Sequence, residues 1–204
     1  MTLAKPRSAL EYRRTLEDML VQVDTFTETV NGMLRLAQSE GGLDPAHRVA
    51  VDMDPLLEEV IDFFSALAED RKIDLSFTGP AGAAVLGDPI WLHQLFANLV
   101  HNALEYTPEG GKIEVLASAD DAEVTVTVRD DGAGMSREDR EIAFQRFQRG
   151  STSSAGNGMG LGLALAREIV RAHAGTIEID SELGRGSTFR VRLPRAPATA
   201  GGTA

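Results

Sequence analysis

The sequence predicts an α+β domain, a two-layer sandwich in which helices cover one face of a mixed β-sheet, preceded by one long N-terminal helix. Three patterns lead to this prediction. Apolar residues near the N-terminus are spaced as in a coiled coil, strand-like and helix-like runs follow one another from residue 49 onward, and a glycine-rich segment continues into an amphipathic helix. A chain of 204 residues with 43% hydrophobic content can bury one sizeable core and carry an appended helix.

Composition excludes several classes of function. A formal net charge of -11 argues against nucleic acid as a partner. No apolar run approaches the roughly eighteen residues of a transmembrane helix, and no signal-peptide pattern is present, so we expect a cytoplasmic chain without membrane contact. The absence of cysteine excludes disulfides and thiolate chemistry.

Residues 9–37 are predicted to form one helix, because apolar side chains recur at alternating steps of three and four. This heptad stripe consists of Ala9, Tyr12, Leu16, Met19, Val23, Phe26, Val30, Met33 and Ala37. Leu20 and Leu34 widen the stripe, which favours a helical bundle over a two-stranded coiled coil. We therefore expect a homo-oligomer that forms through residues 9–37, with a helix lying on its own domain as the alternative.

A doubled glycine at 41–42 ends the helical pattern, and 43–46 is a linker before the domain at 47–194. Within the domain we expect helices at 54–71, from Asp88-Pro89 onward, and from Leu161 onward, and strands at 49–53, 73–77, near Val85, and at 112–117, 123–129, 176–180 and 187–192. The strands should form one mixed sheet. Residues 195–204 are expected to be a flexible tail.

Glycines at every second position, Gly156 to Gly162, lead into the predicted last helix. Such a segment can bring backbone N–H groups close to a phosphate, although a flexible loop uses the same residues. Asp130 to Gly134, a carboxylate and a tight turn at the end of a strand, favour a nucleotide site. A P-loop lysine is absent, and no acidic residue stands in a suitable place for a dinucleotide's ribose, so a third kind of nucleotide fold is needed.

The helix that begins at Asp88-Pro89 should bury one stripe: Leu92, Leu95, Phe96, Leu99, Ala103 and Leu104. Its other side then carries Gln94, Asn98, His101, Asn102 and Glu105. Asn98 and Asn102 are four residues apart and share a face, where they either contact a ligand or are solvated.

Four segments, 98–108, 130–134, 144–147 and 158–163, together resemble the signature boxes of sensor histidine kinases, and 184–189 resembles the closing strand of the same domain. The resemblance implies a catalytic ATP-binding domain at 47–194, with the ATPase fold that gyrase, mismatch-repair proteins and heat-shock chaperones share. Residues 1–42 resemble the second helix of the dimerisation hairpin, most like the heavy-metal-sensor type. Full-length relatives are usually anchored in the inner membrane.

By this resemblance, Asp130 binds the adenine amino group, Asn102 binds Mg²⁺ through its side-chain oxygen, and Tyr106 lies against the base or ribose. For Tyr106 the alternative is a ring that closes the core. Phe144 and Phe147 hold the front of a lid at 150–157, and Arg146 or Arg149 reaches the phosphates. The implied nucleotide-binding set is completed by Gly132, Gly134, Gly158, Gly160, Leu161, Gly162 and Thr188.

Asn98 stands where the hydrolysing relatives have glutamate as a general base, so phosphoryl transfer to histidine is favoured over hydrolysis. Glu105 departs from the lysine or arginine that is usual in the family, and a carboxylate near the phosphates would repel them unless it is turned away or paired.

An acceptor histidine followed by an acidic residue is missing from this sequence. We therefore expect a catalytic part that uses ATP and Mg²⁺ and phosphorylates an acceptor helix supplied in trans, with a response regulator as the further partner. The alternative is a non-catalytic nucleotide-binding and dimerisation module.

Overall fold

The computed structural model describes residues 47–79, 82–148 and 160–197. The predicted N-terminal helix with its heptad stripe, the linker, the lid, Arg149 and Gly158 lie outside the described residues. The elements are β1 (Val49–Asp52), α2 (Met53–Asp70), β2 (Asp74–Thr78), β3 (Ala84–Gly87), α3 (Pro89–Tyr106), β4 (Lys112–Ala119), β5 (Glu123–Asp130), α4 (Arg137–Ile142), α5 (Gly162–Ala172), β6 (Thr176–Glu182) and β7 (Gly186–Pro194).

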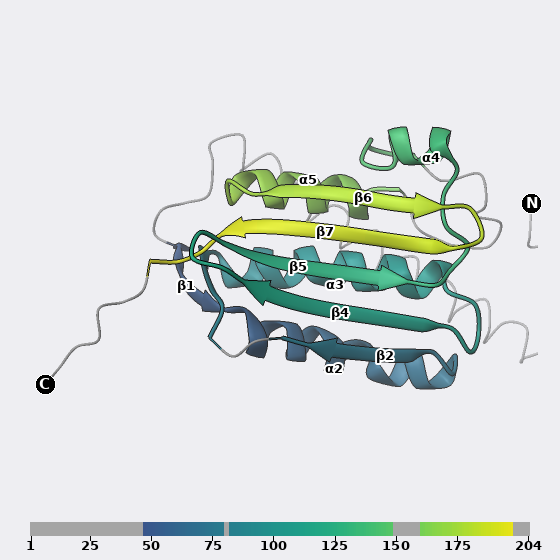
Figure 1. Cartoon of the computed structure of the whole chain (residues 1–204), viewed down its shortest axis with the longest axis horizontal. Coiled ribbons are helices and arrows are strands. Elements are labelled where there is room, and N and C mark those ends of the chain that lie inside the picture. The colour runs from purple at the N-terminus through teal and green to yellow at the C-terminus, as the bar shows by residue number, and fades with distance from the viewer. Residues whose placement is uncertain (1–46, 80–81, 149–159, 198–204) are drawn as a thin grey trace, which may run out of the picture.

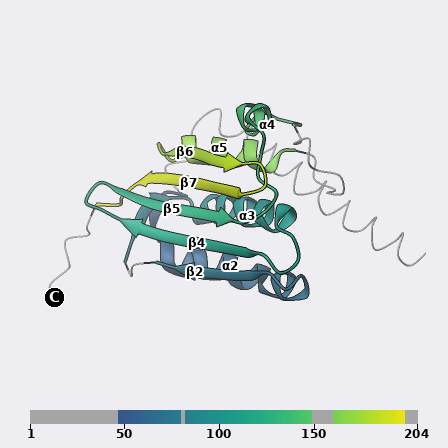
Figure 2. The ribbon, with the colours of Figure 1, turned by 45° about the vertical axis from the view of Figure 1, so that its right-hand side comes forward.

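The main sheet has five strands in the order β2-β4-β5-β7-β6. β2 pairs with β4 in parallel, and the other neighbours are antiparallel. The long helices α2, α3 and α5 lie behind this sheet in Figure 1, and Figure 2 shows the same two layers from another angle. The predicted two-layer α+β sandwich with a mixed sheet is confirmed.

The expectation of one sheet that includes every strand was wrong. β1 and β3 form a separate antiparallel pair, in which Ala50 lies opposite Leu86. The chain after β7 joins this pair, because Val85 bridges Arg195 and the N–H of Ala196 donates to the carbonyl of Ala84 over 2.7 Å. The ordered domain therefore continues past residue 194, into the expected tail.

The sequence analysis also missed α4, which lies beside β6 (Figure 1). Its start is marked by Ser136, whose hydroxyl accepts a hydrogen bond from the N–H of Asp139 over 3.0 Å. A six-residue helix without an apolar stripe has no periodicity to detect, and only this cap could have indicated it.

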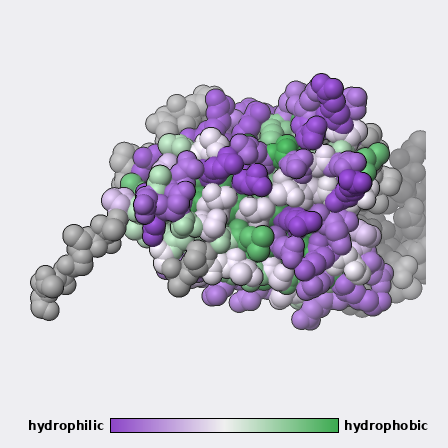
Figure 3. All heavy atoms as spheres, viewed as in Figure 1, coloured by the Kyte–Doolittle hydropathy of each residue, from purple (hydrophilic) through white to green (hydrophobic). Residues whose placement is uncertain are grey.

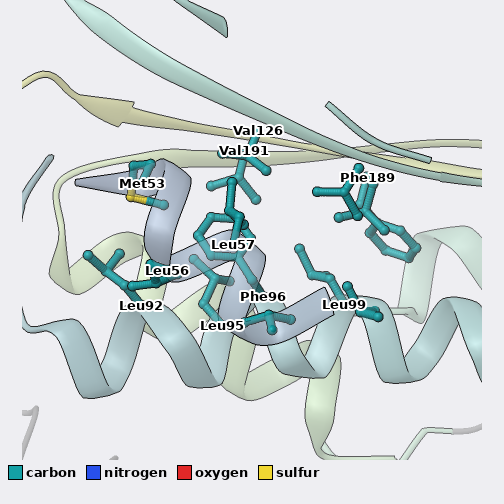
Figure 4. Close-up of a cluster of buried hydrophobic side chains, with 14 of the residues drawn as sticks. Met53, Leu56, Leu57, Leu92, Leu95, Phe96, Leu99, Val126, Phe189 and Val191 are labelled. Atoms are coloured by element: carbon teal, nitrogen blue, oxygen red, sulfur yellow. The ribbon is translucent and has the colours of Figure 1, made fainter. Parts of the chain in front are cut away.

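The core lies between the helices and the sheet. In Figure 4 side chains of α2 and α3, among them Leu57, Phe96 and Leu99, point toward Phe189 and Val191 of β7. The predicted stripe of α3 is confirmed, with every member at most 1% exposed. α3 also begins as predicted, at Asp88, whose Oδ1 accepts hydrogen bonds from the N–H groups of Ile90 and Trp91.

The other face of the sheet carries mainly hydrophilic residues (Figure 3). On it the carboxylate of Glu178 lies 2.8 Å from the guanidinium of Arg192 and 3.8 Å from that of Arg190. Alternation along each strand thus separates a buried apolar face from a solvated charged face.

Candidate functional site

Asp130, the last residue of β5, is a buried carboxylate, with 5% of its surface exposed. Its Oδ1 accepts hydrogen bonds from the N–H groups of Gly132 (2.9 Å) and Ser187 (3.1 Å). Burial raises the pKa of Asp130, the charge of Asp131 adds to the rise, and the two hydrogen bonds oppose it. Because both bonds use Oδ1, a ligand that binds through Oδ2 would leave them intact.

The turn after Asp130 packs on the C-terminal end of α3. The N–H of Ala133 donates to the carbonyl of Tyr106 over 3.1 Å, and a Cβ on Gly132 would lie 2.5 Å from that oxygen. At Gly134, where φ is +65°, a Cβ would lie 2.0 Å from the carbonyl oxygen of Glu182. Both glycines thus permit close contacts between backbone segments: Gly132 brings the turn after Asp130 against Tyr106, and Gly134 brings it against Glu182.

Half-buried Asn98 and Asn102 lie on the same side of α3. The Oδ1 of Asn98 accepts a hydrogen bond from the Nε2 of Gln94 over 3.0 Å. Its Nδ2 is buried and has no hydrogen-bond partner among the described residues. A buried donor without a partner costs free energy, and a bound acceptor would remove that cost.

The N-terminus of α5 faces Asn98. A Cβ built on Gly162 would lie 3.9 Å from the Cγ and Oδ1 of Asn98, so no atom of the described residues would come closer than ordinary van der Waals contact. Leu161 caps the helix without a side-chain hydrogen bond. The first N–H groups of α5 therefore lie beside the side chain of Asn98, and the free amides at a helix N-terminus are donors suited to an anion.

Residues 144–148 precede this helix start. The N–H of Phe147 donates to the carbonyl of Gly160 over 3.0 Å, and Phe147 has a φ of +63° and is 62% exposed. Phe144 instead packs against the core, with the Cζ of Arg167 5.9 Å from its ring centroid. Arg146 is exposed to solvent.

Thr188 does not join the site. Side chains alternate along β7, and Phe189 and Ser187 are both buried, so Thr188 is directed to the solvated face of the sheet. The residue beside Asp130 is Ser187, which sequence analysis missed. Its hydroxyl lies 3.0 Å from that of Ser181, which in turn accepts a hydrogen bond from the N–H of Met135. The alternation around Phe189 could have indicated the correct residue.

Asn102 could hold a magnesium ion through its amide oxygen. Among the described residues, no three His, Cys, Asp or Glu side chains are grouped as a metal site. A single amide oxygen from Asn102 fits Mg²⁺, because this ion binds few protein ligands where phosphates and water complete its coordination shell.

The structure brings several of the predicted residues together in two groups. Asp130, Gly132 and Tyr106 meet at one end of α3. Asn98, Leu161 and Gly162 meet where α3 faces α5.

Three comparisons with known proteins show the family and the fold. Residues 87–197 match the family model described as "Histidine kinase-, DNA gyrase B-, and HSP90-like ATPase". The chain is 33% identical to the sensor-like histidine kinase SenX3 of Mycobacterium tuberculosis over 94% of this chain and 47% of that protein. It is 36% identical to the sensor histidine kinase CusS of Escherichia coli over 95% of this chain and 40% of that protein. The solved structure of full-length ShkA in complex with AMPPNP has a TM-score of 0.76 at 28% identity, over 96% of this chain and 41% of that one.

The chain spans less than half the length of these relatives. None of the described helices is long and apolar enough to cross a membrane.

Proposed function

Because the chain belongs to the family of histidine kinase-, DNA gyrase B- and HSP90-like ATPases, we propose that it is the catalytic part of a sensor histidine kinase. It binds ATP with Mg²⁺, and the γ-phosphoryl group passes to a histidine outside these residues. The observation that carries this proposal is Asp130, a buried carboxylate held through Oδ1 beside the end of α3.

In this proposal Oδ2 of Asp130 accepts a hydrogen bond from the adenine amino group, and Tyr106 lies against the base or ribose. A buried, prearranged acceptor selects a base that presents an N–H donor and rejects one that presents a carbonyl. The solved complex of ShkA with AMPPNP supports an adenine nucleotide as the ligand of this fold.

The triphosphate then extends toward the N-terminus of α5. There the Nδ2 of Asn98 and the first amides of the helix donate to phosphate oxygens, which supplies the partner that the buried Nδ2 lacks. Asn102 holds Mg²⁺, whose charge offsets that of the phosphates. Arg146 and Arg149 are the cations that neutralise charge during transfer.

Transfer to histidine is favoured over hydrolysis because Asn98 is an amide, and an amide cannot remove a proton from water. A neutral imidazole already carries a free lone pair, so its attack on phosphorus needs less help from a general base than the attack of water does.

The acceptor is proposed to lie on a helix supplied in trans, with a response regulator as the next partner. The ring of His173 is buried, and both its nitrogens are engaged, Nδ1 with the carbonyl of Ile169 and Nε2 with the N–H of Asp88. His47 and His101 are exposed and His93 is half-buried, but none precedes an acidic residue as in the acceptor motif.

The test mixes the full chain, labelled ATP and Mg²⁺ with an acceptor-helix fragment of a close relative. We expect label on the fragment and none on the chain, and we expect Asp130→Asn to lower the transfer at ATP concentrations that do not saturate the variant. Arg129→Gln, on the solvated face of the sheet, is the matched control and should act as wild type. ATP binding without transfer to any acceptor helix would instead support the non-catalytic module.

A further inference from the structure

The C-terminal turn of α3 carries two residues of the proposed site, Asn102 and Tyr106. The end of a helix leaves backbone carbonyls without partners inside the helix, and α3 has no basic residue in its last turn to bind them. The position of this turn therefore depends on donors from other elements.

Arg71, the residue that follows α2, supplies those donors from more than thirty positions earlier in the sequence. Its Nη1 donates to the carbonyl of Leu104, and its Nη2 donates to the carbonyl of Thr107 over 2.7 Å. Thr107 is 1% exposed, so the second bond lies at a buried point of the backbone. A planar guanidinium can bind two carbonyls at once in a fixed geometry, and its positive charge suits a helix C-terminus.

The opposite side of the same helix end supports the Asp130 turn. The carbonyl of Tyr106 accepts the N–H of Ala133, and Gly132 is packed against that carbonyl. Arg71 and Ala133 thus bind carbonyls of one helical turn from two directions. A shift of this turn would move Tyr106 and Asn102, and with them the backbone on which Asp130 rests.

We propose that Arg71 is a positioning residue for the nucleotide site, although its two hydrogen bonds go to backbone carbonyls of the helix end. It fixes the end of α3 against α2, and thereby sets the distance between the adenine-binding carboxylate of Asp130 and the amide of Asn102. This inference rests on the proposed function, since it concerns the same nucleotide.

The neighbouring Lys72 offers a matched control. It also links the two turns, through a 2.5 Å ion pair between its Nζ and the Oε1 of Glu109, but both side chains are more than half exposed. Lys72→Gln removes a cation one position away from Arg71 and leaves the helix carbonyls bound. An exposed pair of this kind contributes little to stability.

The experiment measures ATP affinity of the full chain by calorimetry, at a temperature where circular dichroism shows each variant folded. Arg71→Lys keeps the positive charge, but an ammonium group cannot bind both carbonyls in the planar geometry of a guanidinium. We expect it to weaken ATP binding about tenfold, within the range of couplings that residues without ligand contact produce. Lys72→Gln should bind as wild type.

A double-mutant cycle with Asp130→Asn separates positioning from general destabilisation. If Arg71 acts through the Asp130 turn, the double variant loses less affinity than the two single losses combined, whereas a purely structural role gives additive losses. Wild-type affinity in Arg71→Lys, or additivity in the cycle, overturns the proposal.

Arg71→Ala with added guanidinium provides a second test. Millimolar guanidinium should restore ATP affinity to Arg71→Ala and leave Lys72→Gln unchanged, and failure to restore it counts against the fork geometry. A wild-type chain that does not bind ATP would contradict the proposed function itself. Equal ATP binding by the wild type and the Arg71 variants would contradict only the positioning role of Arg71.

Discussion

At the residue scale, burial and adenine binding favour opposite protonation states of Asp130. Its carboxylate is buried, and burial raises its pKa, while a bound adenine requires an acceptor at that place. A carboxyl whose pKa is higher in the folded state holds its proton more tightly there than in the unfolded chain. Its contribution to stability is therefore present at low pH and is lost as the pH rises from the ordinary value of 3.8 through the raised one.

Asp130→Asn should consequently raise the thermal unfolding temperature at neutral pH, because the amide is uncharged and its oxygen can still accept from Gly132 and Ser187. The gain should disappear below the ordinary pKa of an aspartate. The same variant should lose about 1 to 3 kcal/mol of ATP binding. Calorimetric scans from pH 3 to 7, with ATP titrations at pH 7, measure both effects. Unchanged ATP affinity would remove Asp130 from the site.

Glu105 is the second residue with a specific expectation. It is half-buried on α3, three positions after Asn102, so its charge lies near the proposed phosphate path. Glu105→Lys should tighten ATP binding by about 1 kcal/mol at low salt, and less at high salt, because the interaction is between charges. Adenosine, which has no phosphates, should bind equally to both forms.

The control for Glu105 is Glu58→Lys, an equal charge change on an exposed position of α2. If Glu58→Lys has the same effect, the change reflects net charge and not the position of Glu105. Equal tightening of ATP and adenosine by Glu105→Lys would also contradict the expectation.

At the scale of elements, the proposed phosphate site depends on the place where α3 faces the start of α5. Gly162 is the first residue of α5, and an added Cβ would meet Asn98 only at 3.9 Å, which is ordinary contact. The fold does not need glycine at this position, in contrast to Gly134 and Gly186, where a Cβ would lie 2.0 Å from a backbone oxygen.

Gly162→Ala should therefore keep or raise stability, by up to about 1 kcal/mol, since alanine favours a helix more than glycine does. ATP binding should weaken nevertheless, because the methyl group occupies the space between the first amides of α5 and the side chain of Asn98, where the phosphates are proposed to lie. Thermal unfolding and calorimetry on the same sample test both parts. An alanine variant that binds ATP as wild type would place the phosphates elsewhere.

At the scale of the whole molecule, the prediction concerns association through residues 9–37. Side chains such as Leu16, Val23 and Phe26 each gain about 1.5 to 3 kcal/mol on full burial, while the core of the described domain is already filled by α2, α3, α5 and the sheet. We therefore predict a homo-oligomer in which these residues of several copies pack together.

Val23→Glu with Phe26→Lys places charges within the heptad stripe and should give monomers that still bind ATP. Thr25→Glu with Asn31→Lys adds the same charges at positions outside the stripe and outside the heptad position of Leu20 and Leu34, and should leave the oligomer intact. Sedimentation at several concentrations measures the difference. A wild-type chain that is monomeric at tens of micromolar would favour a helix that lies on its own domain.

The kind and order of most elements, and the residue types of the proposed site, can be predicted from the sequence alone. Asp88 with Pro89, the apolar stripe of α3 and the alternation in β4, β5 and β7 are local patterns, and local patterns depend on the spacing of a few residues. The glycine turns and the two asparagines were recognisable for the same reason. α4 was not, because a short helix without an apolar stripe has no such pattern.

Only the tertiary structure decided which distant groups meet, because those meetings depend on how the layers pack. Ser187 donates to Asp130 from 57 positions away, and Arg71 binds Leu104 and Thr107 from 33 and 36 positions away. The separate β1 and β3 pair, joined by Arg195, also follows from strand pairing. Each of these contacts satisfies a backbone donor or acceptor that packing would otherwise leave without a partner, and no spacing along the chain specifies that partner.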